Sequence, residues 1–437
     1  MVKRNERQLK LWRRSVLPSL AAALALGWPG SGLAAQTLAP SSLTSPEPSF
    51  TLQRALALGG VFSPSLAAGN AGIQAAGAGR SLAALRPNPE ISIESDNVGG
   101  TGDYRGLRSA ETTARIALPI ELGGKRSARI AVAKTQVDRA QVAAAVALAD
   151  LELTIRQTYA AAVAADRRLI IAKEQAGLAA ESSRAARARV TAGVASPIEQ
   201  QRSEVLRLNA DAGVERATRT ADVARLNLSR LVGQPVAGPL DEIWFQRIGR
   251  YGPIPQIEAR GTLALALASV DVNAAGAQLR LARAQRIPDL TVSAGARRLA
   301  ATNDVAAVLG VAMAIPLLNN GRAAIAQAQA QQNQAEALRS LALLEAERSI
   351  SRAQEELANA ATTARTAGGP ALAAASEAAR IARIGYRAGK FSQLELLEAE
   401  RTLAQTRSDA IDALAAYHDA EARLSRLAAP VPNLGSR

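Results

Sequence analysis

Two hydrophobic patterns alternate along the chain, and the shorter one has a period of two residues. In "ETTARIALPI" (111–120), charged or polar Glu111, Thr113 and Arg115 alternate with a second set of mostly apolar residues. That second set comprises Thr112, Ala114, Ile116, Leu118 and Ile120. "PDLTVSAGA" (288–296) alternates in the same way. This period predicts strands that lie between two unlike surroundings. Because a pair of strands is not stable alone, these segments need partners, most simply from other copies of the chain.

The second pattern is helical and much longer. Residues 123–190 and 321–386 are rich in Ala, Gln, Glu and Arg and almost free of Gly and Pro, which predicts single helices about 100 Å long. Shorter helices at 51–86, 196–232 and 257–286, and one ending near residue 429, are expected to run back beside them. The Gly- and Pro-containing residues 234–256 predict an irregular segment partway along this rod.

One short stretch occurs twice, as "VTAGVASPIEQQRSE" (190–204) and "YRAGKFSQLELLEAE" (386–400). The strand segments recur at a similar separation, so the chain consists of two copies of one unit. The first repeat, 36–233, holds the N-terminal helix, a strand pair at about 88–121 and a helical hairpin at about 123–232. The second repeat has the same order, and a tail follows it. This second repeat, 257–430, consists of a helix from 257, a strand pair at about 287–317 and a hairpin at about 321–429. The tail is 431–437.

The repeated stretch predicts the turn of each hairpin. Gly193 and Gly389 stand where a helix must end, and glycine adopts the left-handed conformation without steric cost. Ser196-x-x-Glu199 and Ser392-x-x-Glu395 are capping-box patterns that start the next helix. Each hairpin tip is therefore expected at the end of the rod far from the strands.

Composition narrows the functional classes. The basic run before the apolar "SVLPSLAAALALGW" predicts a signal peptide over residues 1–35. The net charge is +14, but the arginines are scattered among acidic residues, so no nucleic-acid partner is expected. The chain has no cysteine, and His418 is its single histidine, so we expect no dedicated metal site, no cofactor and no Ser-His-Asp enzyme.

Taken together, "TAGVAS", "RAGKFS" and the C-terminal "GYRAGKFSQLELLEAERTLAQTRSDAIDALAAYHDAEARL" resemble the TolC family of outer-membrane efflux channels over about residues 50–430. The spacing from Pro370 to "GYRAGK" is most similar to the heavy-metal efflux branch. The resemblance implies a mainly α fold with a β-barrel part. In such a homotrimer each chain gives four strands to a shared 12-stranded barrel in outer-membrane lipid, and the helices form a periplasmic tunnel.

The same resemblance implies partners and sites. A periplasmic adaptor, linked to an inner-membrane pump of the RND type, would dock at the tips. The matching residues are Gly193, Val194, Ala195, Ser196, Gly389, Lys390, Phe391 and Ser392. Because Lys390 and Phe391 replace small residues of the first copy, the two tips are not expected to bind an adaptor identically. Glu395 and Glu398 match the acidic gate of the tunnel, although a capping role alone would also explain Glu395.

Pro370, in "AGGPAL", has no counterpart in the first repeat and predicts either a hinge or a static bend in the second hairpin. The strand segments lack the aromatic residues that usually border a membrane barrel. The function predicted is a passive channel for an efflux pump, with divalent heavy-metal cations as the expected cargo. The alternatives are a multidrug or polypeptide export channel of the same family, and a periplasmic coiled-coil adaptor or structural protein.

Overall fold

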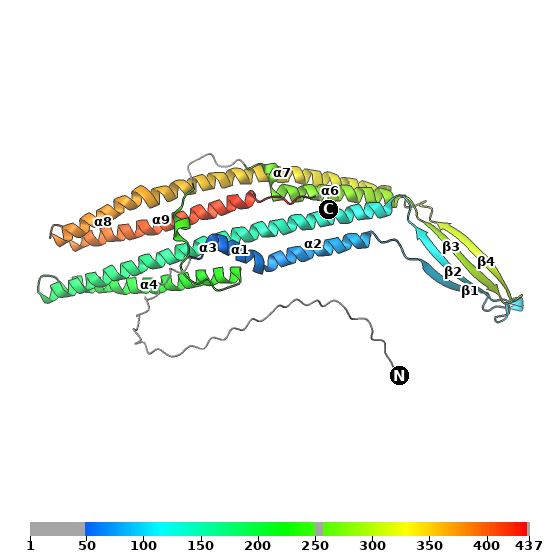
Figure 1. Cartoon of the computed structure of the whole chain (residues 1–437), viewed down its shortest axis with the longest axis horizontal. Coiled ribbons are helices and arrows are strands. Elements are labelled where there is room, and N and C mark those ends of the chain that lie inside the picture. Colours follow the sequence, from blue (N-terminus) through cyan, green and yellow to red (C-terminus); the bar gives the residue numbers. More distant parts are fainter. Residues whose placement is uncertain (1–48, 250–256, 435–437) are drawn as a thin grey trace, which may run out of the picture. The chain divides into compact units, whose positions relative to one another are not determined.

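The structure, a computed structural model, describes residues 49–249 and 257–434. The expected signal peptide lies outside the described residues. The elements form long helices and one antiparallel sheet (Figure 1). The predicted fold class, mainly helical with four strands, is confirmed.

The first hairpin is built from two helices. α3 (Lys125–Thr191) has 67 residues, about 100 Å at 1.5 Å per residue. α4 (Pro197–Val232) returns beside α3 and ends at Gly233, whose φ of 75° is left-handed. Much of the buried surface of α3 is alanine, so its neighbours approach its backbone closely.

The second hairpin has the same plan with one interruption. Its long arm consists of α7 (Arg322–Thr366) and α8 (Leu372–Arg387), and α9 (Gln393–Leu427) returns beside them. A π-helical turn, η3 (Ala367–Ala371), joins the two parts of the long arm and contains Pro370. The wider turn accommodates a residue without an N–H, so the arm stays helical through the proline.

The single N-terminal helix predicted over 51–86 is wrong in one respect. The structure has two helices there, α1 (Leu52–Phe62) and α2 (Pro64–Ala83), bent by 46° at Ser63. Pro64 occupies the first position of α2, where its missing N–H costs nothing, but it cannot continue α1.

Among the described residues no single helix is long and apolar enough to cross a bilayer, although this bent pair meets that criterion when taken together.

The irregular segment between the repeats contributes α5 (Glu242–Gln246), followed by the short η2 (Ala259–Gly261) and α6 (Leu263–Gln285). The largest hydrophobic cluster lies where α5 contacts α3 and α9. We call this cluster the equatorial node and define it by Phe50, Tyr159, Leu228, Phe245 and Ile411, all buried.

The four strands form one sheet in the order β1-β2-β3-β4, with all neighbours antiparallel. Their bounds are β1 (Glu90–Asp96), β2 (Glu111–Ile120), β3 (Leu290–Leu299) and β4 (Asp304–Met313), with η1 (Gly102–Tyr104) in the first loop. Each strand connects to one long helix, so α2, α3, α6 and α7 continue the strand order as a layer of neighbouring helices (Figure 1).

Candidate functional site: the hairpin tips and the strand sheet

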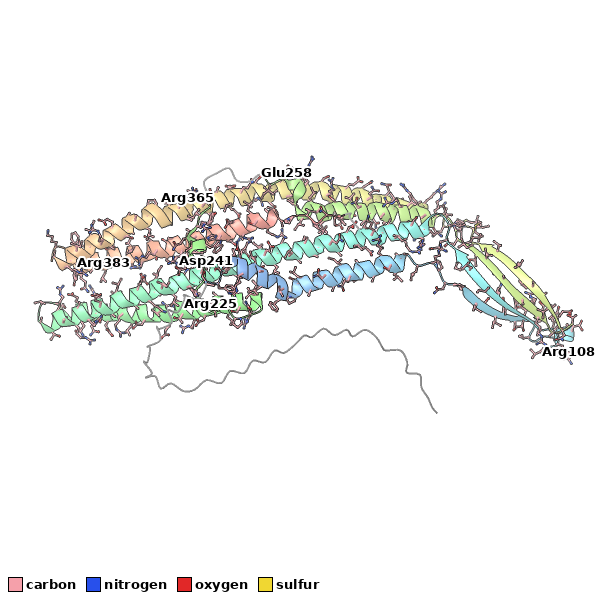
Figure 2. All side chains as sticks on the ribbon, in the orientation of Figure 1. Arg108, Arg225, Asp241, Glu258, Arg365 and Arg383 are labelled. Carbon is pink, nitrogen blue, oxygen red and sulfur yellow. The ribbon has the colours of Figure 1, made fainter. Side chains whose placement is uncertain are left out.

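The tips and the sheet occupy opposite ends of the described chain. Arg383, close to the second turn, and Arg108, in the loop between β1 and β2, mark these two ends in Figure 2. A conformational change at one end can therefore reach the other end only through the helices.

The first tip closes α3 through glycine. Gly193 has a left-handed φ of 72°. The N–H of Val194 donates to the carbonyl of Arg189 at 3.0 Å, and the Val194 side chain is 67% exposed. An apolar side chain is thus held at the end of the rod with no partner in the described chain, as a docking surface requires.

The first of the two predicted capping boxes is wrong. The Ser196 hydroxyl accepts from the N–H of Ile198, not from that of Glu199. The Glu199 carboxylate turns away from the cap, and its Oε1 lies 3.9 Å from Nε of Arg189. That oxygen is buried and makes no hydrogen bond among the described residues.

The second tip is shaped by a different contact. Gly389 has a φ of 71°, and the N–H groups of Lys390 and Phe391 both donate to the carbonyl of Gly385. The Phe391 ring covers Gly385 so closely that a Cβ there would lie 2.2 Å from a ring carbon. The two tips therefore present different surfaces, with Val194 at one and a partly fixed phenyl ring at the other.

The second capping box forms as predicted. Glu395 Oε2 accepts from the N–H of Ser392 at 2.7 Å, and the Ser392 hydroxyl accepts from the N–H of Glu395. The bond from the Ser392 N–H lowers the pKa of Glu395. Glu398, one turn further along α9, is exposed. Its side chain makes no hydrogen bond or ion pair within residues 49–249 and 257–434.

A set of contacts that the sequence did not predict joins the two hairpins between the equatorial node and the tips. Four hydrogen bonds, spaced along α3, join it to the second hairpin; α3 donates in two of them and accepts in the other two. The pairs are Arg168 to Asp412 at 3.1 Å, Arg407 to Glu174 at 2.7 Å, Gln393 to Ser182 at 3.4 Å and Arg189 to Tyr386 at 3.3 Å. The Tyr386 hydroxyl raises the pKa of Arg189. All four are polar contacts between residues more than 190 positions apart, which single-sequence periodicity does not reveal.

The predicted hinge lies in the π-helical turn. Nothing lies within 4 Å of where a Cβ would be on Gly368 or Gly369, next to Pro370. The glycine side of the turn is thus open, while Ala367 packs against the cluster that contains Ala413 and Tyr417.

The sheet has two unlike faces. On one face, Ile91 pairs with Ile116 and Val292 with Val311, and Leu309 is 83% exposed. On the other, Arg115 forms an ion pair with Glu94, and Arg297 pairs with Glu111 across β2 and β3. An exposed apolar face on a sheet whose reverse is charged is typical of a wall between lipid and water.

No metal-binding cluster of three or more His, Cys, Asp or Glu residues occurs in the described part of the chain. His418 is buried in the equatorial node, where its ring stacks on Trp244 and its Nε2 lies 2.8 Å from the carbonyl oxygen of Phe245. This placement gives His418 a packing role.

Paired helical hairpins, with exposed turns at one end and a two-faced sheet at the other, define a channel-forming export protein. The chain belongs to the outer membrane efflux protein family, which matches residues 51–234 and 255–429.

Two relatives from Cupriavidus metallidurans are similar over much of their length. The chain is 28% identical to the cobalt-zinc-cadmium resistance protein CzcC over 389 residues, which is 86% of this chain and 89% of CzcC. It is 33% identical to the nickel and cobalt resistance protein CnrC over 62% of this chain and 64% of CnrC.

Among solved structures, a membrane protein from Pseudomonas aeruginosa has the same fold, with a TM-score of 0.75 at 19% identity over 88% of this chain and 91% of that one. The chain is thus an outer-membrane efflux channel, and the alternative of a periplasmic adaptor does not hold.

Proposed function

We propose that three copies of this chain form the outer-membrane channel of a tripartite efflux system that passively conducts divalent heavy-metal cations. The observation that carries this proposal is the sheet, which exposes an apolar face and pairs neither outer edge within the described residues. Sheet edges are not tolerated in hydrocarbon, so closure with other chains is needed. Three sheets of four strands would give the 12-stranded barrel that the family resemblance implies.

The cargo assignment rests on the relatives. CzcC and CnrC are resistance proteins for cobalt, zinc, cadmium and nickel, and we extend the class of divalent metal to this chain. The near absence of His, Cys and Met from the sequence is consistent with a channel that does not select its cargo by tight binding, since selection can take place in the pump.

We assign adaptor docking to the two tips. The first tip exposes Val194, and Ala195 beside it is half-buried. The second tip exposes Lys390 and Phe391. The left-handed glycines hold these turns in shape. An adaptor with two similar but not identical sites would match this pair of surfaces, and an inner-membrane pump would complete the system.

The gate is proposed at Glu398, with Glu395 contributing mainly as a helix cap. Replacing Glu398 by Gln should reduce the preference of the open channel for cations over anions, because one unpaired carboxylate is lost from each chain at the constriction. Reversal potentials in a salt gradient, recorded in planar bilayers, measure this preference. The matched variant Glu355→Gln, on exposed α7 surface, should leave it unchanged. An unaltered selectivity in Glu398→Gln would remove the gate assignment.

The function is tested by deleting the gene and challenging the strain with cobalt, zinc, cadmium and nickel salts, and separately with drugs. Loss of metal tolerance alone, restored by the intact gene, supports the proposal. Loss of drug tolerance alone supports a multidrug channel instead. The native mass of the detergent-extracted protein tests the trimer independently of cargo.

A further inference from the structure

The junction between the sheet and the helices has an unusual concentration of arginine. Every helix that meets the sheet carries an exposed arginine close to its strand. Arg86 follows α2, Arg126 is the second residue of α3, and Arg322 is the first of α7. Arg286 caps the end of α6, with Arg280 and Arg283 in its last two turns. We call these six residues the arginine collar.

Direct contacts join the segments of the collar into one rim. Nε of Arg126 donates to the carbonyl of Ala84 at 2.6 Å, which ties α3 to the end of α2. Lys125 Nζ lies 2.8 Å from Asp289 Oδ1, which ties α3 to the segment before β3. A Cβ on Gly321 would lie 3.6 Å from Cα of Arg286, so the start of α7 lies against the end of α6.

The charge of the collar is not neutralised. The acidic residues of the rim, Glu121 and Asp289, are paired with Arg129 and Lys125, which are not collar residues. None of the six collar arginines has an acidic partner within the part of the chain that the structure describes. The first turns of α3 and α7 contain no acidic residue, so the partial positive charge of these helix ends adds to that of the collar.

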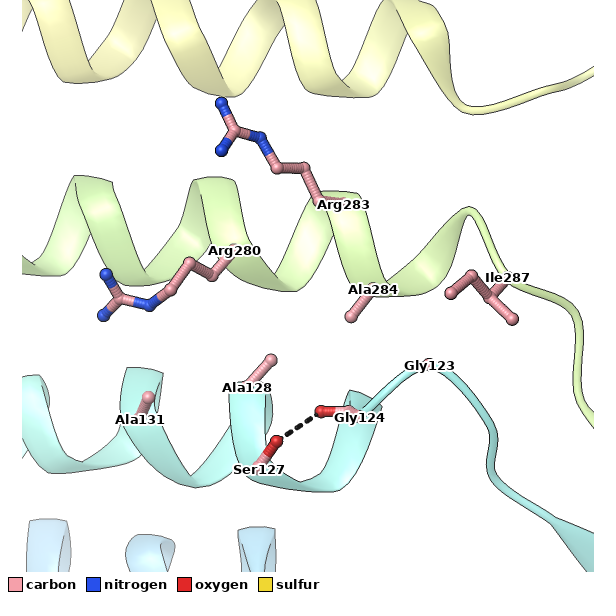
Figure 3. Close-up of a pocket in the computed structure, with 9 residues that line it drawn as sticks. All are labelled: Gly123, Gly124, Ser127, Ala128, Ala131, Arg280, Arg283, Ala284 and Ile287. Carbon is pink, nitrogen blue, oxygen red and sulfur yellow. Dashed lines mark hydrogen bonds between the residues drawn. The ribbon is translucent and has the colours of Figure 1, made fainter.

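The guanidinium groups are accessible. Figure 3 shows Arg283 extending from α6 toward α7, and Arg280 lying along the groove between α6 and α3. Small residues line that groove opposite the arginines: Gly123 and Gly124 just before α3, and Ser127, Ala128 and Ala131 within it.

The collar begins where the apolar face of the sheet ends. Ile91 and Ile93 of β1, and Leu309 and Val311 of β4, are more than 70% exposed. None of the four strands contains an aromatic residue, so the aromatic belt that commonly fixes a barrel at the membrane surface is missing.

We propose that the arginine collar binds the phosphate groups of anionic phospholipids in the periplasmic leaflet of the outer membrane, and so replaces the aromatic belt on that side. This inference rests on the proposed function, because only a membrane-embedded sheet places the collar at head-group level. Guanidinium groups bind phosphate oxygens in bidentate fashion, and clustered basic residues at a membrane surface attract anionic lipid.

Native mass spectrometry of the detergent-extracted protein, titrated with phosphatidylglycerol and with phosphatidylcholine, tests the proposal. The wild type should retain phosphatidylglycerol in preference, and the variant Arg86→Gln/Arg280→Gln/Arg283→Gln/Arg286→Gln should lose about tenfold of that preference. The control Arg216→Gln/Arg348→Gln/Arg352→Gln/Arg401→Gln removes equal charge from exposed helix surface away from the sheet and should behave as wild type.

Equal retention of the two lipids by the wild type, or unchanged preference in the collar variant, would overturn the proposal. Binding to purified peptidoglycan that the collar variant alone loses, with lipid retention unaffected, would assign the collar to the cell wall and also overturn it. The same spectra separate this result from the proposed function. A trimer without lipid preference contradicts only the collar, whereas a monomer that needs no detergent contradicts the channel itself.

Discussion

Replacing Tyr159 by alanine is expected to lower the free energy of unfolding by about 3–5 kcal/mol, in the range measured for large aromatic residues in protein cores. Tyr159 is fully buried in the equatorial node. Its hydroxyl donates to the carbonyl of Phe50 at 2.6 Å and accepts from the N–H of Asp241 at 2.9 Å. The ring also meets Trp244 edge-on, with centroids 5.2 Å apart. One side chain thus joins the N-terminal segment, α3 and α5.

The conservative variant Tyr159→Phe separates packing from hydrogen bonding. It keeps the ring but leaves two buried backbone groups unsatisfied, for an expected loss of about 1–3 kcal/mol. Thermal and denaturant unfolding followed by circular dichroism measure both variants. Tyr104→Ala, in an exposed loop, is the control and should have little effect. If Tyr159→Ala were no less stable than Tyr104→Ala, the node would not be the main core of the helical part.

Alkaline pH gives a second measurement on the same residue. Burial raises the pKa of Tyr159 from 10.0 to about 12. The neutral phenol is therefore favoured in the folded state, and its contribution is fully present below pH 10 and is lost as the pH rises through about 12. The stability difference between wild type and Tyr159→Phe should accordingly narrow above pH 10, and a difference that stayed constant would contradict the assignment.

The second large effect is expected in the sheet, at Gly295. A Cβ there would lie 2.3 Å from the carbonyl oxygen of Ala114 and 2.7 Å from Cβ of Arg115 on the neighbouring strand. Backbone atoms cannot move aside without disturbing the ladder between β2 and β3, so Gly295→Ala should cost about 1–3 kcal/mol. Assembly of the closed sheet should suffer accordingly.

Gly310 provides the matched control. A Cβ on Gly310 meets only the hydroxyl oxygen of Ser293, at 2.7 Å, and that side chain can rotate away. The fraction of the proposed trimer that resists heating in detergent should therefore fall in Gly295→Ala and stay near wild type in Gly310→Ala. Equal losses in both variants would mean that the sheet rejects any added methyl group, whatever its neighbour.

Local periodicity was sufficient to predict the fold class. Alternation in residues 111–120 and the long Ala-rich runs identified strands and hairpins, because both signals are carried by consecutive residues. The break at Ser63 was missed although Pro64, which cannot continue a preceding helix, is visible in the sequence. The capping box at Ser196 also did not form: its hydroxyl caps the helix through Ile198, and Glu199 does not take part.

The functional residues were less accessible to sequence reasoning. The docking role of the tip residues and the gate role of Glu398 came from the family resemblance, whereas the hinge at Pro370 came from the missing N–H of proline. All of these roles stay predictions. The contact of Arg189 with Tyr386 joins residues 197 positions apart, and the arginine collar gathers residues from four helices. Such groupings depend on how the helices are placed side by side, which no local pattern records.

The four polar contacts that join the hairpins between the node and the tips respond to salt differently from the node itself. Two of them, Arg168–Asp412 and Arg407–Glu174, are exposed ion pairs, which contribute little each and weaken as salt screens them. The other two contacts each include an uncharged partner, and the buried equatorial node does not respond to salt in this way. The salt concentration around these helices is therefore expected to change how firmly the hairpins are held together toward the tips, while the node keeps them joined.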